Sequence, residues 1–102
     1  MIHVLAVVTA KPGMRAAVLD AFRANVPNVL AEAGCIEYGA AVDADNALGS
    51  QIRYGPDTFV VVEKWASMDA LRAHAAAPHM AAYGAKTKEL IASRVSHILA
   101  PA

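Results

Sequence analysis

The sequence has a single cysteine, no excess of either charge and no long apolar run, and each shortage excludes a class of protein. Cys35 has no second cysteine to pair with, so a disulfide-stapled secreted domain is excluded and a reducing cytoplasm is expected. Nine basic residues balance nine acidic ones, which leaves no basic stripe for a nucleic-acid backbone. The apolar runs, such as 4–8 and 59–62, fall far short of the ~20 residues of a membrane helix. We therefore expect a cytoplasmic protein that binds neither nucleic acid nor a membrane.

The chain also lacks the short motifs that mark common cofactor and catalytic sites. It has no glycine-rich phosphate loop, no dinucleotide-binding glycine pattern and no serine nucleophile elbow. It has neither paired cysteines nor a zinc-binding His-Glu-x-x-His. The sequence thus carries no signature of a nucleotide, flavin, zinc or acyl-enzyme site.

The patterning predicts one α+β domain over residues 1–102. Alternating or continuous apolar residues indicate four strands, at 2–9, 35–43, 58–65 and 94–99. Helical spacing and capping residues indicate three helices: one from residue 14 to a stop at Gly34, one at 68–77 and one at 78–91. We expect Pro27 to bend the first helix, and Ile52 and Tyr54 to be able to extend a strand within the loop at 43–57. The order β-α-β-β-α-β is typical of a ferredoxin-like fold, an antiparallel sheet with helices on one face.

The other face of such a sheet has no helices to cover it. Val60 and Val62, together with one side of the first strand, would form an apolar patch on that face. Large exposed apolar patches mark interaction surfaces. We therefore expect a homodimer that packs through the sheet face.

Three polar residues are candidates for acid–base chemistry. His74 and His79 flank the helix break at Pro78, which can turn both imidazoles toward one cavity, and histidine is the natural base near neutral pH. Glu63 shares a strand face with aromatic residues, where burial would raise its pKa. The alternatives are a capped or packed histidine, and a glutamate at the sheet edge or paired with Arg72.

Aromatic and sulfur-containing side chains suggest an apolar pocket for a flat ring. Candidates for its wall are Trp65, Tyr38, Phe59, Met80 and Tyr83, which would otherwise be ordinary core residues. Cys35 has no basic neighbour in the sequence and is interpreted as a structural cysteine.

The ordered set of motifs resembles the antibiotic biosynthesis monooxygenase superfamily, and within it the small bacterial quinol monooxygenases. The resemblance runs through segments 17–22, 26–30, 32–38 and 56–65, and its most specific part is Leu71-x-Ala73-His74-x-x-x-Pro78-His79-Met80-x-x-Tyr83. It implies a ferredoxin-like, dimeric α+β barrel with a ligand cavity between sheet and helices. It also implies oxidation of a quinol or related phenol by O₂ without a metal, flavin or other cofactor.

Within that resemblance, His74 would be the base, with Glu63 or His79 orienting it or the substrate, and the aromatic wall residues would hold the ring. Two alternatives stay open: an isomerase of a phosphorylated quorum-signal sugar, whose branch carries a similar His-x-x-x-Pro-His run, and a non-catalytic binding protein for a small aromatic metabolite. The haem-degrading branch uses an Asn, Trp and His set. This chain has Ala6, His74 and Gly84 at those places, so the resemblance does not extend to haem degradation.

Overall fold

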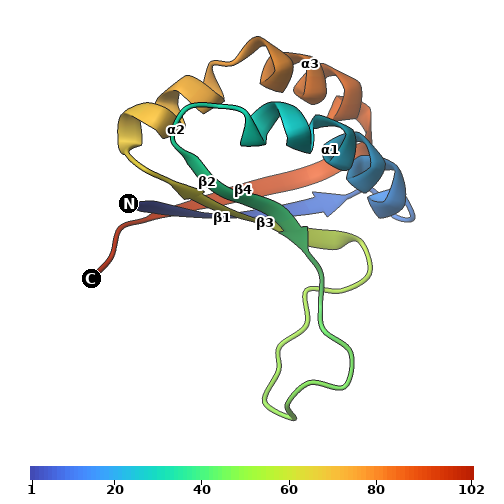
Figure 1. The fold of residues 1–102 in the computed structure, drawn as a ribbon. Helices are drawn as coiled ribbons and strands as arrows, with labels where there is room; N and C mark the ends of the chain where they lie inside the picture. Colours follow the sequence, from blue (N-terminus) through green and yellow to red (C-terminus); the bar gives the residue numbers. More distant parts are fainter.

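The computed structural model describes all residues, 1–102, as a four-stranded antiparallel sheet with its helices on one face (Figure 1). The strand order is β2-β3-β1-β4. The elements in chain order are β1 Ile2–Ala10, α1 Arg15–Leu30, β2 Cys35–Ala41, β3 Thr58–Trp65, α2 Met68–Ala75, α3 Pro78–Thr87, the short 3₁₀ helix η1 Lys88–Leu90, and β4 Ile91–Leu99. This confirms the ferredoxin-like α+β fold. None of the helices is both long and apolar enough to cross a bilayer.

The helix boundaries near the middle of the chain follow from local chemistry. The Ser67 hydroxyl accepts a hydrogen bond from the Ala70 N–H at 3.1 Å and caps α2, while Asp69 lies in the first turn, where the helix dipole favours a negative charge. Pro78 occupies the start of α3, where its missing N–H has no cost. The predicted break between two helices at Pro78 is therefore confirmed.

Two predicted boundaries were wrong. The first helix ends at Leu30 rather than at Gly34. It contains Pro27, because a proline so close to the C-terminus removes only one late hydrogen bond. The last strand starts at Ile91, three residues earlier than predicted, because α3 ends at Thr87 and η1 closes it off.

The second strand is shorter than the predicted 35–43, and most of its residues are not buried. A register shift between Cys35 and Glu37 turns Ile36 out to solvent, and Val42 lies beyond the end of the strand. Only Tyr38 of β2 is buried. Ile52, which could have extended a strand, lies in the loop 42–57 and is 93 % exposed. In Figure 1 this loop projects away from the helices.

The core lies between the sheet and the helices. Alternate residues of β1 and β3 point to the helices, and the ring of Phe22 from α1 packs on them. Phe22 stacks on Tyr38 and meets Phe59 and Tyr83 edge-on, with centroids 5.2 to 6.3 Å apart. The few aromatic residues are thus concentrated at one place, beside the candidate site.

The opposite face of the sheet is bare. Six apolar residues point away from the helices, and none of them is buried: Leu5, Val7, Val60, Val62, Val95 and Leu99. We call these six residues the outer face. Their arrangement confirms the expected apolar patch.

Gly34 allows the turn after α1 to pass close to α2. Its φ is +82°, in the region that favours glycine, and a Cβ placed on it would lie 2.6 Å from the Ala70 Cβ. The Gly34 carbonyl also accepts a hydrogen bond from the Ala66 N–H at 2.8 Å. This close approach brings the turn that contains Glu32 next to the helix that contains His74.

We predict that Gly34→Ala lowers the free energy of unfolding by about 2–4 kcal/mol, because it adds a steric clash to the unfavourable left-handed conformation. Gly13→Ala is the matched control. Gly13 also has a positive φ, +78°, but a methyl group added to it would meet no atom within 4 Å, so a loss of about 1 kcal/mol is expected. Urea unfolding of both variants measures the difference, and equal losses would contradict the close approach.

Candidate active site

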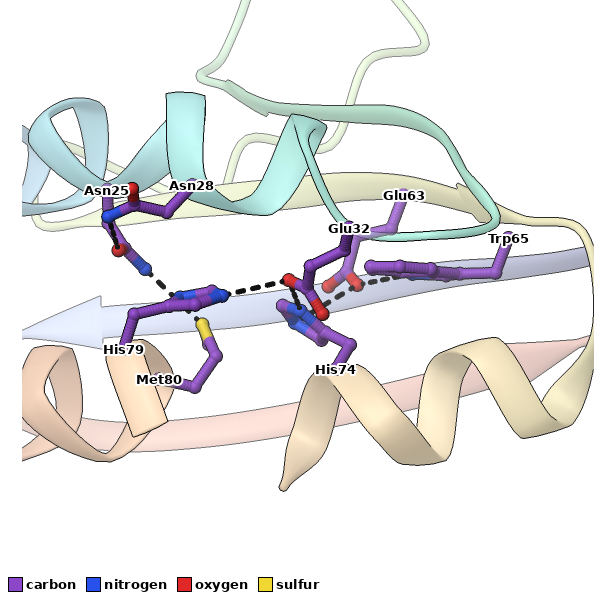
Figure 2. A network of polar contacts seen from close by, with 8 residues as sticks. All are labelled: Asn25, Asn28, Glu32, Glu63, Trp65, His74, His79 and Met80. Atoms are coloured by element: carbon purple, nitrogen blue, oxygen red, sulfur yellow. Dashed lines mark hydrogen bonds and ion pairs between the residues drawn. The ribbon is translucent and has the colours of Figure 1, made fainter. Parts of the chain in front are cut away.

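His74 is held inside the protein by a carboxylate from another element. It lies near the end of α2 and is 4 % exposed. Its Nδ1 lies 2.8 Å from Oε2 of Glu32, in the turn between α1 and β2 (Figure 2). An ionised carboxylate only accepts, so Nδ1–H donates to it. A neutral His74 then keeps the lone pair of Nε2 free, which is the arrangement of a general base.

Glu63 lies on the other side of the imidazole. Its Oε1 is 3.9 Å from Nε2 of His74 and accepts a hydrogen bond from Trp65 Nε1 at 2.9 Å. Burial raises the pKa of Glu63 above its ordinary value, while the Trp65 hydrogen bond and the nearby His74 and Arg94 oppose the rise. His74 and Glu63 therefore form one chain of polar groups with Trp65 and Glu32.

This chain of groups borders a cavity between the sheet and the helices. The cavity has a volume of about 350 Å³, which suits a small ring compound. His74 and Glu63 supply its polar wall, and Met80 supplies part of its apolar wall. The rest of the lining is mostly small: Val4, Leu71, Ala75, Ala76, Ala77, Ala81, Arg94, Ser96 and Ile98.

His79 does not line this cavity. It faces a separate hollow of about 220 Å³ between α1 and α3. Its Nε2 lies 3.2 Å from the same Glu32 oxygen that contacts His74, but neither ring nitrogen makes a hydrogen bond. Nearby, Asn28 donates to Asn25, whose amide points to the Met80 sulfur (Figure 2). His79 therefore adjoins the site through Glu32 and through the His74 ring, whose centroid is 6.5 Å from its own.

The predicted ring-holding residues take different places. Tyr38 and Tyr83 line an adjoining cavity of about 270 Å³. Trp65 is fully buried and does not line a cavity, but its ring lies 4.6 Å from the His74 ring. Phe59 is fully buried against Phe22 and borders only a hollow near the loop 42–57. It points to the same side as Glu63 but lies four residues before it along β3, away from the cavity that Glu63 lines. Substrate contact by Phe59 therefore has no support in the geometry.

Two residues of the site were missed by the sequence prediction. Glu32 lies in a turn, and only the contact at Gly34 brings it to His74. Its position two residues before a glycine, at the predicted end of a helix, was the available signal. Arg94 lies on β4 and faces the helices together with Ser96 and Ile98. For this residue the available signal was the alternation of side chains along the predicted strand.

Other titratable groups nearby are held in their neutral forms. Burial raises the pKa of Tyr83, and burial followed by the charge of Glu63 raises that of Tyr38, so both phenols are hydrogen-bond donors rather than bases. Burial also raises the pKa of the Cys35 thiol, which fits a structural cysteine. No group of three or more His, Cys, Asp or Glu residues is arranged to hold a metal ion.

We predict that Glu63→Gln becomes more stable relative to the wild type as pH rises. The raised pKa means that the folded protein binds the Glu63 proton more tightly than the unfolded chain, so stability is lost as pH rises through the interval above the ordinary carboxyl pKa. Glutamine removes this titration and keeps an acceptor for Trp65. Urea unfolding of both proteins at about pH 4 and about pH 8 measures the change. A difference that stays constant or shrinks with pH would argue against burial of the charge.

Comparison with known proteins shows which family the chain belongs to. The model of the antibiotic biosynthesis monooxygenase family matches residues 1–86. The chain is 39 % identical over 103 residues to the Escherichia coli K12 protein named "Probable quinol monooxygenase YgiN", covering 99 % of this chain and 98 % of that one. One similar solved structure is PA3566 from Pseudomonas aeruginosa, which is 26 % identical, covers 99 % of this chain and 93 % of its own, and has a TM-score of 0.81. Another is Rv0793 from Mycobacterium tuberculosis, which is 27 % identical, covers 99 % of this chain and 94 % of its own, and has a TM-score of 0.80. The chain belongs to the antibiotic biosynthesis monooxygenase family.

Proposed function

We propose that this protein oxidises a quinol or a related electron-rich phenol with O₂, in the cavity beside His74. The observation that carries the proposal is a buried imidazole, oriented by Glu32, whose Nε2 lies 3.9 Å from Glu63 at the wall of a cavity lined mostly by apolar residues. Family membership and the likeness to a protein named as a quinol monooxygenase support it. No additional observation favours the sugar isomerase or the non-catalytic binding protein.

The chemistry needs a base and a water-poor cavity. Nε2 of His74 takes the proton of a ring hydroxyl, and the resulting phenolate is a far better one-electron donor than the phenol. Transfer of one electron to O₂ gives a substrate radical and superoxide, which join at a ring carbon that carries hydrogen. The proton returns to the peroxide, which loses water and leaves a carbonyl. One oxygen atom of O₂ enters the product and the other leaves as water.

Each protein group then has a defined task. Glu32 holds the imidazole in the tautomer that accepts at Nε2 and stabilises it once protonated. Glu63, fixed by Trp65, lies where it can contact the hydroxyl that His74 deprotonates. Met80 and the alanines of α2 and α3 limit the access of water. These residues position and deprotonate the substrate, and the substrate itself reduces O₂.

We predict that His74→Ala reduces quinol-dependent oxygen uptake by about 100-fold or more, the usual contribution of a general base. The measurement uses an oxygen electrode, metal-free protein and a panel of quinols, with protein-free samples correcting for autoxidation. Arg72→Gln is the control on the same helix, because Arg72 is exposed, pairs only with Asp69 and lines no cavity. No uptake by the wild type with any quinol would overturn the proposed activity, and full uptake by His74→Ala would overturn the role of the base.

We also propose that the outer face joins two copies of the chain. The exposed surface is 6198 Å², against about 5,500 Å² expected for a monomer of this mass. The excess accompanies the apolar outer face, which is centred on the two middle strands, β3 and β1. A second copy of the same face is the occupant whose chemistry matches it, since apolar residues meet apolar residues across a two-fold axis.

We predict that Val62→Glu shifts the protein to monomers and weakens association about 100-fold or more, because a carboxylate on the central strand β3 would be desolvated in the interface. Leu30→Glu is the control, because Leu30 is equally apolar and half-exposed but lies at the end of α1, on the helical side. Sedimentation velocity across a range of concentrations measures the association. A monomeric wild type, or an unchanged dimer in Val62→Glu, would contradict the proposal.

A further inference from the structure

The cavity at His74 and the adjoining cavity at Tyr38 are neighbours, because Arg94 lines both. Both lie on the helix-facing side of the sheet, the first over Val4 and the second over Val8 of β1. Successive turns of α3 cover them, with Met80 over the first and Tyr83 over the second. Arg94 is the one residue that lines both, so its side chain lies where they meet. We call the two together the cleft.

The two ends of the cleft have different electrostatic character. The first end has the imidazole of His74 and the carboxyl group of Glu63. The second end has Lys88 in addition to Arg94, and no carboxylate lines it. A molecule that reacts at His74 and extends along the cleft would therefore reach a region of positive charge at its far end.

Arg94 has no protein partner for its charge. It makes no ion pair and no side-chain hydrogen bond, although β4 leaves it exposed beside the apolar walls of both cavities. Arg72 and Arg15 differ, since Arg72 pairs with Asp69 and Arg15 donates to backbone carbonyls. Lys88, which lines the second cavity, is like Arg94 without a protein partner. The electrostatic influence of Arg94 on Glu63, Tyr38 and Tyr83 is in accord with its place between them.

We propose that Arg94 is a specificity-determining residue that binds an anionic substituent, of the carboxylate type, on the aromatic substrate. The inference rests on the proposed function for the identity of the reacting ring, and adds the class of ring. A planar guanidinium matches a carboxylate in shape and charge and can bind it through two hydrogen bonds. The hydroxyls of Tyr38 and Tyr83, held neutral, are available as further donors to such a group.

The test compares two ligands that differ only in charge: gentisate, a hydroquinone with a carboxylate, and gentisamide, its uncharged amide. Binding of each to the full-length protein is measured by calorimetry without oxygen, so that no turnover occurs. We expect the wild type to prefer gentisate and Arg94→Gln to reduce that preference about tenfold, the value of one charge-assisted hydrogen bond. Arg94→Lys should retain part of the preference, and added salt should weaken it.

Arg72→Gln removes the same charge outside the cleft and should leave the ratio of the two affinities unchanged. Equal affinity of the wild type for the two ligands, no measurable binding of gentisate, or an unchanged ratio in Arg94→Gln would overturn the proposal. Oxygen uptake with the same ligands tests the proposed function separately. An Arg94-dependent preference would support the anion site whether or not these ligands are oxidised, and absence of uptake with the whole quinol panel would overturn the oxidation. Uptake with an unchanged ratio would support the oxidation and overturn the anion site.

Discussion

The hydrogen bond between Glu32 and His74 is the interaction on which the candidate site depends. Both side chains are almost removed from water, and a buried carboxylate is costly unless a donor faces it. His74 supplies that donor, and in return its ring is fixed in orientation. The bond joins a turn to a helix far along the chain, so it exists only because Gly34 lets the backbone pass Ala70 at a distance that no other residue allows. The close approach of the Gly34 backbone to α2 and the hydrogen bond between Glu32 and His74 thus occur where the same turn passes the same helix.

The chain uses its few aromatic residues for packing and for the site at once. Five of the six aromatic side chains lie on the helix-facing side of the sheet, either in contact with Phe22 or, as Trp65 does, beside His74. A domain of this size has a small core, so the wall of a cavity cannot be separate from it. Large side chains pack the middle, and alanines of α2 and α3 leave the open volume. The cavity results from this distribution of size along the helices.

The sequence predicted most of the fold and half of the site, for identifiable reasons. Alternation along residues 59–65 places Glu63 and Trp65 on one face wherever the strand lies, and Pro78 after a capped helix fixes the break between α2 and α3. Glu32 could not be found in this way, because its partner is decided by how two elements cross. The outward turn of Ile36 depends on a register shift with β3, which only the pairing reveals. Alternation along β3 likewise predicted which side of the sheet Phe59 points to, but it could not predict how far Phe59 lies from the cavity.

Strand β4 has an edge position, and its two sides do different work. Arg94, Ser96 and Ile98 point toward the helices, whereas Val95 and Leu99 point the other way. Because strand side chains alternate, gain or loss of a single residue within β4 would exchange the two sets. Such a change would put Val95 in the cleft and Arg94 on the outer face together.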